Sequence, residues 1–375
     1  MSNVENEVDV LGFNPEDLFS NGGQTSGQST SNSLIYHTKP SESKSEDGVY
    51  RAKIKVIYNP ENPKQSFLEQ QSYGMKDKDG FFSVVSSLTN GDKSCPIFTA
   101  WKKCHFSDEG SVLYKQALTK EKGGNGLFDK RFARYVIVQI LKDKNQPELV
   151  GSFKLWKLPT SIYTLLQQKM QPSKESGKMP IPVMDYLFGR AINIEVLPGP
   201  DDKQNPMRKT REITYQGELT EDVVSCVNPD GSPLLNDNEQ EILDSYVSKI
   251  SKAWKMTCED EDDEERRNEI IKKAKESDEY KELLKIYKRV LDDIKQWAPK
   301  LDQLSYKPWT DDVKNRVDRW IKIVLDGHDP ETYVGEGELQ KDREQQDDAA
   351  QPANADNGQK STVEVKDEDP DELPF

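Results

Sequence analysis

Apolar and polar residues alternate most regularly near the start of the chain, in residues 50–58. Side chains two positions apart share one face of a strand, so each set of alternate residues belongs to one face. One face is apolar and the other is cationic: the first carries Tyr50, Ala52, Ile54, Val56 and Tyr58, the second Arg51, Lys53 and Lys55. We therefore expect a strand with a core face and a basic face.

A second pattern, over residues 129–158, predicts two strands around a polar turn at residues 142–147. Cations and large aromatic residues accompany both strands: Lys130, Arg131, Arg134, Tyr135, Lys154 and Trp156. Such a ribbon can hold a phosphate backbone and stack on exposed bases. The alternative is an ordinary hairpin with its aromatic residues in the core and its lysines in solvent. Arg134 and Tyr135 are adjacent, so they point to opposite faces unless a bulge intervenes.

The remaining periodicity predicts an α+β fold. Further strands are expected at residues 67–73, 81–88 and 191–197, and a helix begins at Thr160 or Ser161. Beyond these, helical spacing predicts three helices, over residues 237–254, 262–297 and 310–326. We expect an OB-fold-like small β-barrel with inserted helices over residues 47–230. It lies between a flexible segment, residues 1–46, and a helical subdomain, residues 231–330, which a disordered acidic tail, residues 331–375, follows.

Charge divides this chain in a way that its net charge of −15 conceals. Residues 51–215 hold 27 Lys and Arg against 17 Asp and Glu, a balance of +10. Residues 329–375 hold 4 against 15, a balance of −11. A basic domain joined to an acidic segment is typical of nucleic-acid-binding modules with an interaction tail. The polar loop at residues 201–211 adds three cations to the basic set: Arg208, Lys209 and Arg211.

Signatures of enzymes and cofactors are missing from the sequence. The Gly-rich residues 122–126 lack the spacing and ending of a phosphate-binding loop, and no hydrolase or metalloprotease motif occurs. Cys95, Cys104 and His105 do not form a zinc pattern, because a Cys-x-x-Cys pair would need Cys where Phe98 stands. The acidic run at residues 259–265 fits a divalent ion less well than the first turn of a helix. We expect no enzyme, no metal and no cofactor.

The sequence also lacks membrane and secretion signals. No run of 18 apolar residues occurs, and the N-terminus has neither a basic nor an apolar leader region. The four cysteines show no disulfide framework. We expect a cytoplasmic protein without a membrane partner.

The last residues predict a docking motif. Acidic residues stand directly before a terminal apolar pair, in the order Asp369, Pro370, Asp371, Glu372, Leu373, Pro374 and Phe375. An aromatic residue with a free carboxylate at the end of a polar tether suits an apolar pocket with a basic rim. A tail that only increases solubility would not need this ending.

The tip resembles that of bacterial single-stranded DNA-binding proteins, which implies recruitment of replication and repair proteins. Over about residues 47–213 the chain resembles the helix-destabilising, single-stranded DNA-binding proteins of T-even phages, which implies an oligonucleotide-binding fold. The resemblance rests on the order of the pieces: the strand at residues 50–58, Ser94-Cys-Pro, the basic lead-in to residues 136–143, Gly151-x-Phe-Lys, and residues 182–196. It implies that Lys130, Arg131, Arg134 and Tyr135 contact DNA.

The chain departs from that family in two places. The family binds zinc through one His and three Cys, and only Cys95 keeps its place here. The family's basic N-terminal cooperativity segment is replaced by acidic residues 1–19.

The sequence as a whole predicts a bacteriophage single-stranded DNA-binding protein of the bacterial host's cytoplasm. It would protect DNA in replication, recombination and repair, recruit partners through its tip, and associate with itself on DNA. The alternative is a virion or scaffold protein whose basic face binds protein. Binding to an oligonucleotide separates the two.

Overall fold

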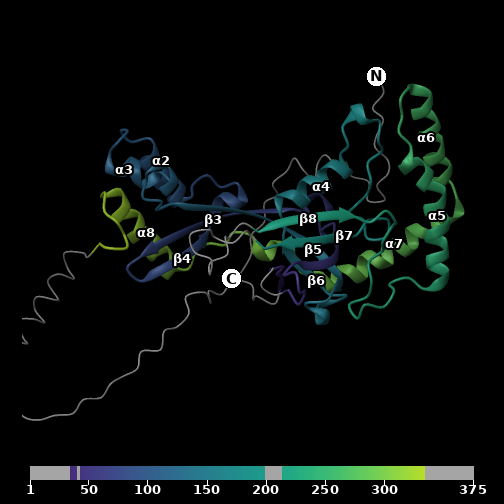
Figure 1. The fold of residues 1–375 in the computed structure, drawn as a ribbon, viewed down its shortest axis with the longest axis horizontal. Coiled ribbons are helices and arrows are strands. Elements are labelled where there is room, and N and C mark those ends of the chain that lie inside the picture. The colour runs from purple at the N-terminus through teal and green to yellow at the C-terminus, as the bar shows by residue number, and fades with distance from the viewer. Residues whose placement is uncertain (1–33, 40–42, 199–212, 334–375) are drawn as a thin grey trace, which may run out of the picture. The chain divides into compact units, whose positions relative to one another are not determined.

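A computed structural model describes residues 34–39, 43–198 and 213–333 of the chain, which form two compact units (Figure 1). Unit 1 comprises Met1–Gln71, Ser87–Asp92 and Phe132–Lys307. Unit 2 comprises Ser72–Ser86, Lys93–Arg131 and Pro308–Phe375. The fold is mixed α+β, with eight strands in one open sheet and seven α-helices among the described residues.

The strands hydrogen-bond in the order β1-β6-β5-β2-β7-β8, and β3 pairs with both β4 and β5. All the pairs with a described register are antiparallel except β1 with β6, which is parallel. Their bounds are β1 (Ile35–Tyr36), β2 (Tyr50–Ile57), β3 (Leu68–Asp77), β4 (Gly80–Val85), β5 (Asp129–Asp143), β6 (Phe153–Lys157), β7 (Ile192–Leu197) and β8 (Thr214–Leu219).

Strand β2 lies inside the sheet of unit 1, between β5 and β7. Its register with β5 shifts between Lys53 and Ile54, which marks a bulge. Only the first half of its predicted basic face reaches solvent: Arg51 is exposed, Lys53 is half-buried and Lys55 is fully buried. We expected an apolar face of β2 in the core and a basic face in solvent. This expectation fails at Lys55, because both faces of β2 are covered there.

The helices of unit 1 complete its core. Figure 1 shows α5 and α6 side by side and α7 running towards the strands. An Asn236 capping box begins α5, and Asp260 caps α6, whose acidic first turn accounts for the acidic run in the sequence. The bounds of these helices are α4 (Thr160–Met170), α5 (Asp237–Lys255), α6 (Glu261–Lys275) and α7 (Asp278–Trp297).

Unit 2 has a separate apolar core, which includes Tyr73, Met75, Ile97, Cys104 and Trp320. Its helices are α2 (Pro96–His105), α3 (Val112–Ala117) and α8 (Asp311–Leu325). An ion-paired group stabilises the turn between β3 and β4: Arg316 Nε and Nη2 lie 2.8 and 2.7 Å from the Asp77 carboxylate oxygens. This hydrogen bonding lowers the pKa of Asp77.

Several predicted elements differ from the observed ones. The N-terminal segment was expected to be flexible up to residue 46, but Tyr36 is buried in β1 and donates a hydrogen bond to Asp143 at 2.7 Å. The predicted helix over residues 262–297 is two helices, because Ser277 caps the start of α7. The loop between β3 and β4 is shorter than predicted, because only two residues separate the end of β3 from the start of β4. Strand β8 was not predicted.

The two units also divide the chain differently from the predicted domains. The sequence places all helices after residue 231 in one subdomain. In the structure α5, α6 and α7 belong to unit 1 with the sheet, whereas α8 belongs to unit 2. Helical periodicity shows which face of a helix is buried but not which core covers it.

Candidate nucleic-acid interface

The first half of β5 carries a basic and aromatic surface in unit 1, which we call the unit-1 patch: Phe132, Arg134 and Tyr163. The Arg134 guanidinium lies 3.6 Å from the Tyr163 ring centroid and 5.5 Å from that of Phe132. Phe132 is 49% exposed, which is unusual for so large an apolar side chain. An arginine held between two rings offers both a phosphate contact and a stacking face.

Glu69 of β3 occupies the polar side of Arg134. Arg134 Nη2 and Nε lie 2.5 and 3.1 Å from Glu69 Oε1. The Glu69 side chain is 40% exposed, whereas that of Arg134 is only 16% exposed, so water reaches the pair mainly from the carboxylate side. The carboxylate therefore holds Arg134 in place and stands where an incoming phosphate oxygen would bind.

Unit 2 carries a second basic and aromatic surface, which we call the unit-2 patch: Phe81, Phe98, Lys102, Lys130 and Arg131. The Arg131 guanidinium lies 5.1 Å from the Phe81 ring centroid. Lys102 Nζ and Lys130 Nζ lie 4.4 and 5.9 Å from the ring centroid of Phe98. Lys130 and Arg131 are exposed, so this patch presents cations and aromatic rings together to solvent.

Gly74 of β3 allows the Arg131–Phe81 contact to form. A Cβ added at Gly74 would lie 3.1 Å from both Arg131 Nη2 and Phe81, and 3.0 Å from Asp129 Oδ2. Asp129 in turn accepts hydrogen bonds from Arg131 Nε and Nη2 at 2.8 and 2.6 Å. The glycine thus leaves room for the side chains of two neighbouring strands to cross over its backbone.

The predicted basic residues of β2 contribute less than expected. Arg51 is exposed, but Asp47 and Glu195 bind its guanidinium at 2.7 and 2.8 Å. Lys55 is fully buried and is removed from the predicted DNA-binding set. Its Nζ fills the space that a Cβ would take at Gly189, and burial lowers the pKa of its ammonium to about 8.

Trp156 was predicted to offer a stacking face, but it is only 1% exposed. Its Nε1 lies 3.4 Å from Thr38 Oγ1, and β1 pairs alongside it through Tyr36. The prediction is wrong because the N-terminal segment, expected to be flexible, covers this ring.

Tyr135 and Lys154 lie at intermediate positions. Tyr135 is half-buried against the core of unit 1, and this burial raises its pKa. Arg134, the preceding residue, contacts Tyr163 on the surface. The two neighbours do point in different directions, as strand alternation predicts. Lys154 is half-buried in β6, opposite Val138.

Two groups of predicted site residues lie outside the described residues. One is the loop group, Arg208, Lys209 and Arg211. The other is the tip, Asp369, Asp371, Glu372, Leu373, Pro374 and Phe375. Both stay predictions from the sequence.

Sequence reasoning missed four aromatic residues of the patches: Phe81, Phe98, Phe132 and Tyr163. Phe132 had a readable signal, because it stands between Arg131 and Arg134 in the stretch already singled out. Gly74 gave no such signal, because the strand was predicted to end at Tyr73, and only the longer observed β3 places this glycine inside a strand. Tyr163 had none, because only the tertiary fold brings α4 beneath Arg134.

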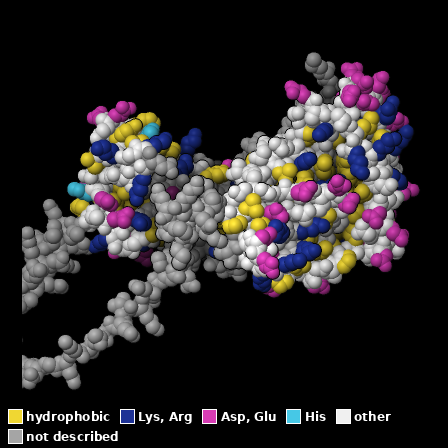
Figure 2. All heavy atoms as spheres, in the orientation of Figure 1, with side chains coloured by type: hydrophobic (Ala, Val, Ile, Leu, Met, Phe, Trp, Pro, Cys, Tyr) yellow, Lys and Arg dark blue, Asp and Glu magenta, His cyan; other side chains and the backbone are white. Residues whose placement is uncertain are grey.

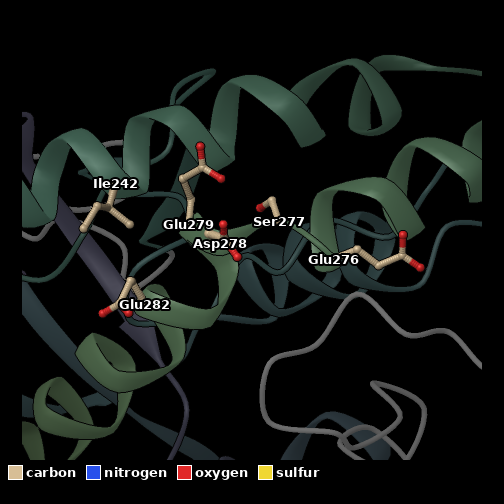
Figure 3. Close-up of a pocket in the computed structure, with 6 residues that line it drawn as sticks. All are labelled: Ile242, Glu276, Ser277, Asp278, Glu279 and Glu282. Atoms are coloured by element: carbon tan, nitrogen blue, oxygen red, sulfur yellow. The ribbon is translucent and has the colours of Figure 1, made fainter.

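A hollow in unit 1 is lined by Ile242 of α5 and by acidic side chains around the start of α7 (Figure 3). Glu279 there is paired with Lys249 at 2.7 Å. No group of three or more His, Cys, Asp or Glu side chains in the described residues is placed to hold a metal ion. All four cysteines are free thiols.

Among the described residues, no helix is long and apolar enough to cross a membrane. No protein-family model and no curated protein sequence matches this chain.

Proposed function

We propose that this protein binds single-stranded DNA without sequence preference, through the unit-1 and unit-2 patches. The observation that carries the proposal is the first half of β5, where the cations Lys130, Arg131 and Arg134 accompany the half-exposed ring of Phe132. Cations neutralise phosphates, and every base offers a face that stacks on an aromatic ring. A surface of this composition therefore suits an unpaired strand better than a duplex.

The proposal includes an oligonucleotide-binding fold for the strands of unit 1. Such a fold is a five-stranded, partly open barrel. Strands β2, β5, β6, β7 and β8 form a continuous antiparallel series, and β1 extends it beyond β6. Next to β1, Thr38 Oγ1 lies 3.4 Å from the Tyr215 hydroxyl of β8, at the other end of the series. Tyr215 and Trp156 also meet edge to face. These side-chain contacts link the two ends of the open sheet and support a partly open barrel of this kind.

The biological setting is part of the same proposal. We infer a bacteriophage protein that protects DNA during replication, recombination or repair in the host cytoplasm. Its C-terminal tip, residues 369–375, would recruit replication and recombination proteins. The support is the sequence pattern of the tip and the charge division between the body and residues 329–375.

The salt dependence of binding tests this proposal. The affinity for a fluorescent 30-nucleotide oligo-dT is measured as NaCl is raised. Each phosphate neutralised on a single strand contributes a slope of about −0.7 to log K against log [salt]. Three or more cations predict a slope of about −2 or steeper. A protein without measurable affinity for oligo-dT at low salt, or with a slope near zero, would refute the proposal.

A further inference from the structure

Helix α2 carries a row of aromatic rings that the predicted interface did not include. Phe98, Trp101 and His105 follow one another along the helix, and Tyr114 of α3 continues the row. The centroids of Phe98 and Trp101 lie 5.8 Å apart, with their planes 10° from parallel. Those of Trp101 and His105 lie 4.8 Å apart at 11°, and those of His105 and Tyr114 lie 6.2 Å apart at 23°. We call these four residues the α2 ladder.

The ladder lies away from the core of unit 2. The core face of α2 consists of Ile97, Ala100 and Cys104, which are all buried. The ladder residues are only half-buried, and the next residue, Phe106, is 77% exposed and meets His105 edge to face at 5.1 Å. A surface helix normally turns one apolar face inward and a polar face outward. Helix α2 instead has a second, aromatic face whose side chains are partly exposed.

Cations flank this aromatic face. Lys102 and Lys103 are exposed on α2, which has no acidic residue, and Lys130 of β5 reaches the Phe98 end of the ladder. The nearest acidic residues in the sequence are Asp92 before the helix and Asp108 and Glu109 after it. Figure 2 shows hydrophobic side chains, a histidine and Lys or Arg side chains over α2 and α3, with Asp or Glu side chains at the upper edge of the same region. The charge complements a polyanion.

The geometry of the rings also suits bases. Centroid separations of this size belong to offset rather than fully overlapped stacks, so each ring leaves part of a face open. A base can stack on such a face while its phosphate contacts a neighbouring lysine. An apolar protein partner would not need the rings to be parallel or the rim to be cationic.

We propose that the α2 ladder is a base-stacking platform that extends the unit-2 patch, so that unpaired bases stack from Phe98 along the helix. The inference rests on the proposed function, because it names where bases of the same DNA would lie. It assigns the platform to a helix, whereas the sequence had assigned stacking to strands. Phe98 joins the two surfaces, since both Lys130 and Lys102 lie over its ring.

Two ligands of equal length separate base stacking from phosphate binding: oligo-dT and the same oligonucleotide with all its bases removed. The variant Phe98→Leu keeps an apolar side chain of similar size but loses the aromatic face. We expect its affinity for oligo-dT to fall about 10-fold, within the range for one lost stacking contact. Its affinity for the abasic strand should equal that of the unmodified protein.

The variants Trp101→Leu and Trp101→Phe form a matched pair. The first should weaken oligo-dT binding about as much as Phe98→Leu, and the second should retain most of the affinity. Circular dichroism and the abasic affinity show whether each variant is folded, so a folding defect in one variant leaves the other to decide.

The outcomes distinguish this inference from the proposed function. If the unmodified protein binds oligo-dT but both leucine variants bind it equally well, the ladder is no base platform and the proposed function stands. Such a result would leave the ladder as a protein-binding face. If the unmodified protein does not bind oligo-dT, both proposals fail.

Discussion

Strands β2 and β5 both combine cations with apolar residues, yet they present very different surfaces. On β2, Arg51 is bound by two carboxylates and Lys55 is buried. On β5, Lys130 is exposed, and Arg131 is exposed beside the Phe81 ring, although one carboxylate, that of Asp129, accepts its hydrogen bonds. Strand β2 pairs with β5 over Ala52–Ile57 and with β7 over Tyr50–Ile54, so both its edges lie inside the sheet. The comparison teaches that period two specifies a shared face and not whether that face meets solvent.

The strongest way to sharpen this comparison is charge reversal on β5. We expect Lys130→Glu together with Arg131→Glu to weaken oligo-dT binding about 100-fold at low salt, since two phosphate contacts become repulsive. Arg51→Glu should change the affinity much less, because Asp47 and Glu195 already bind Arg51. Fluorescence polarisation measures both. Equal losses in the two variants would mean that β2 and β5 contribute alike.

The buried lysine of β2 gives the next largest effect, on stability. Lys55 Nζ has no hydrogen-bond partner in the described residues and lies in the core, so its charge opposes folding. We expect Lys55→Met to raise the free energy of unfolding at pH 7 by about 1 to 3 kcal/mol. Urea titration measures the change, with Lys53→Met as the control. A destabilised Lys55→Met protein would show that the ammonium is stabilised inside the fold.

The pH dependence of stability is a second readout at the same residue. The pKa of Lys55 is about 8 in the folded protein, whereas the ordinary lysine pKa, which applies to the unfolded chain, is 10.5. Between these values the unfolded chain binds a proton that the folded protein has released, so stability should rise with pH. The contribution of Lys55 is thus unfavourable below about pH 8 and disappears above 10.5. This rise should be missing in Lys55→Met, and an identical pH profile in both proteins would contradict the assignment.

A smaller effect is expected at the exposed ring of β5. Phe132→Ala removes a stacking face but no charge, so oligo-dT binding should weaken about 5- to 10-fold. The slope against salt should stay unchanged, because Arg134 keeps its charge. Titrations at three salt concentrations give both quantities. If the slope against salt changes while the affinity for oligo-dT does not, Phe132 serves to position Arg134 instead of stacking on bases.

The smallest effect tests the ring that the fold covers. Trp156→Phe loses the contact of Nε1 with Thr38, which should lower the free energy of unfolding by about 1 kcal/mol. Binding to oligo-dT should be unaffected, since Trp156 is buried beneath β1. Thermal unfolding and a binding titration of the same sample check the two halves. Weaker oligo-dT binding without a loss of stability would mean that Trp156 does contact DNA, as the sequence predicted.

Much of the fold could be predicted from residues whose pattern along the sequence is typical of a strand or a helix. The strict alternation in β2, the largely apolar Val136–Ile140 of β5 and the starts of α5 and α8 all lie where the sequence indicates an element. The candidate surface was readable in part, because Lys130 and Arg131 were singled out and are exposed on β5, with Arg134 half-buried further along the strand. Strand β1 was missed because two residues carry no period, and they form a strand only beside β6.

The sequence by itself determined which residues share a face, where α5 and α8 start, and that a basic body is joined to an acidic tail. Those properties depend on neighbours along the chain and on composition. The tertiary structure decided which faces are covered: it buried Lys55 and Trp156, set Tyr163 under Arg134, and left the second face of α2 partly exposed. Burial depends on segments far apart in sequence meeting in space, such as Thr38 with Trp156. No local pattern encodes that meeting, because its free energy comes from surfaces removed from water together.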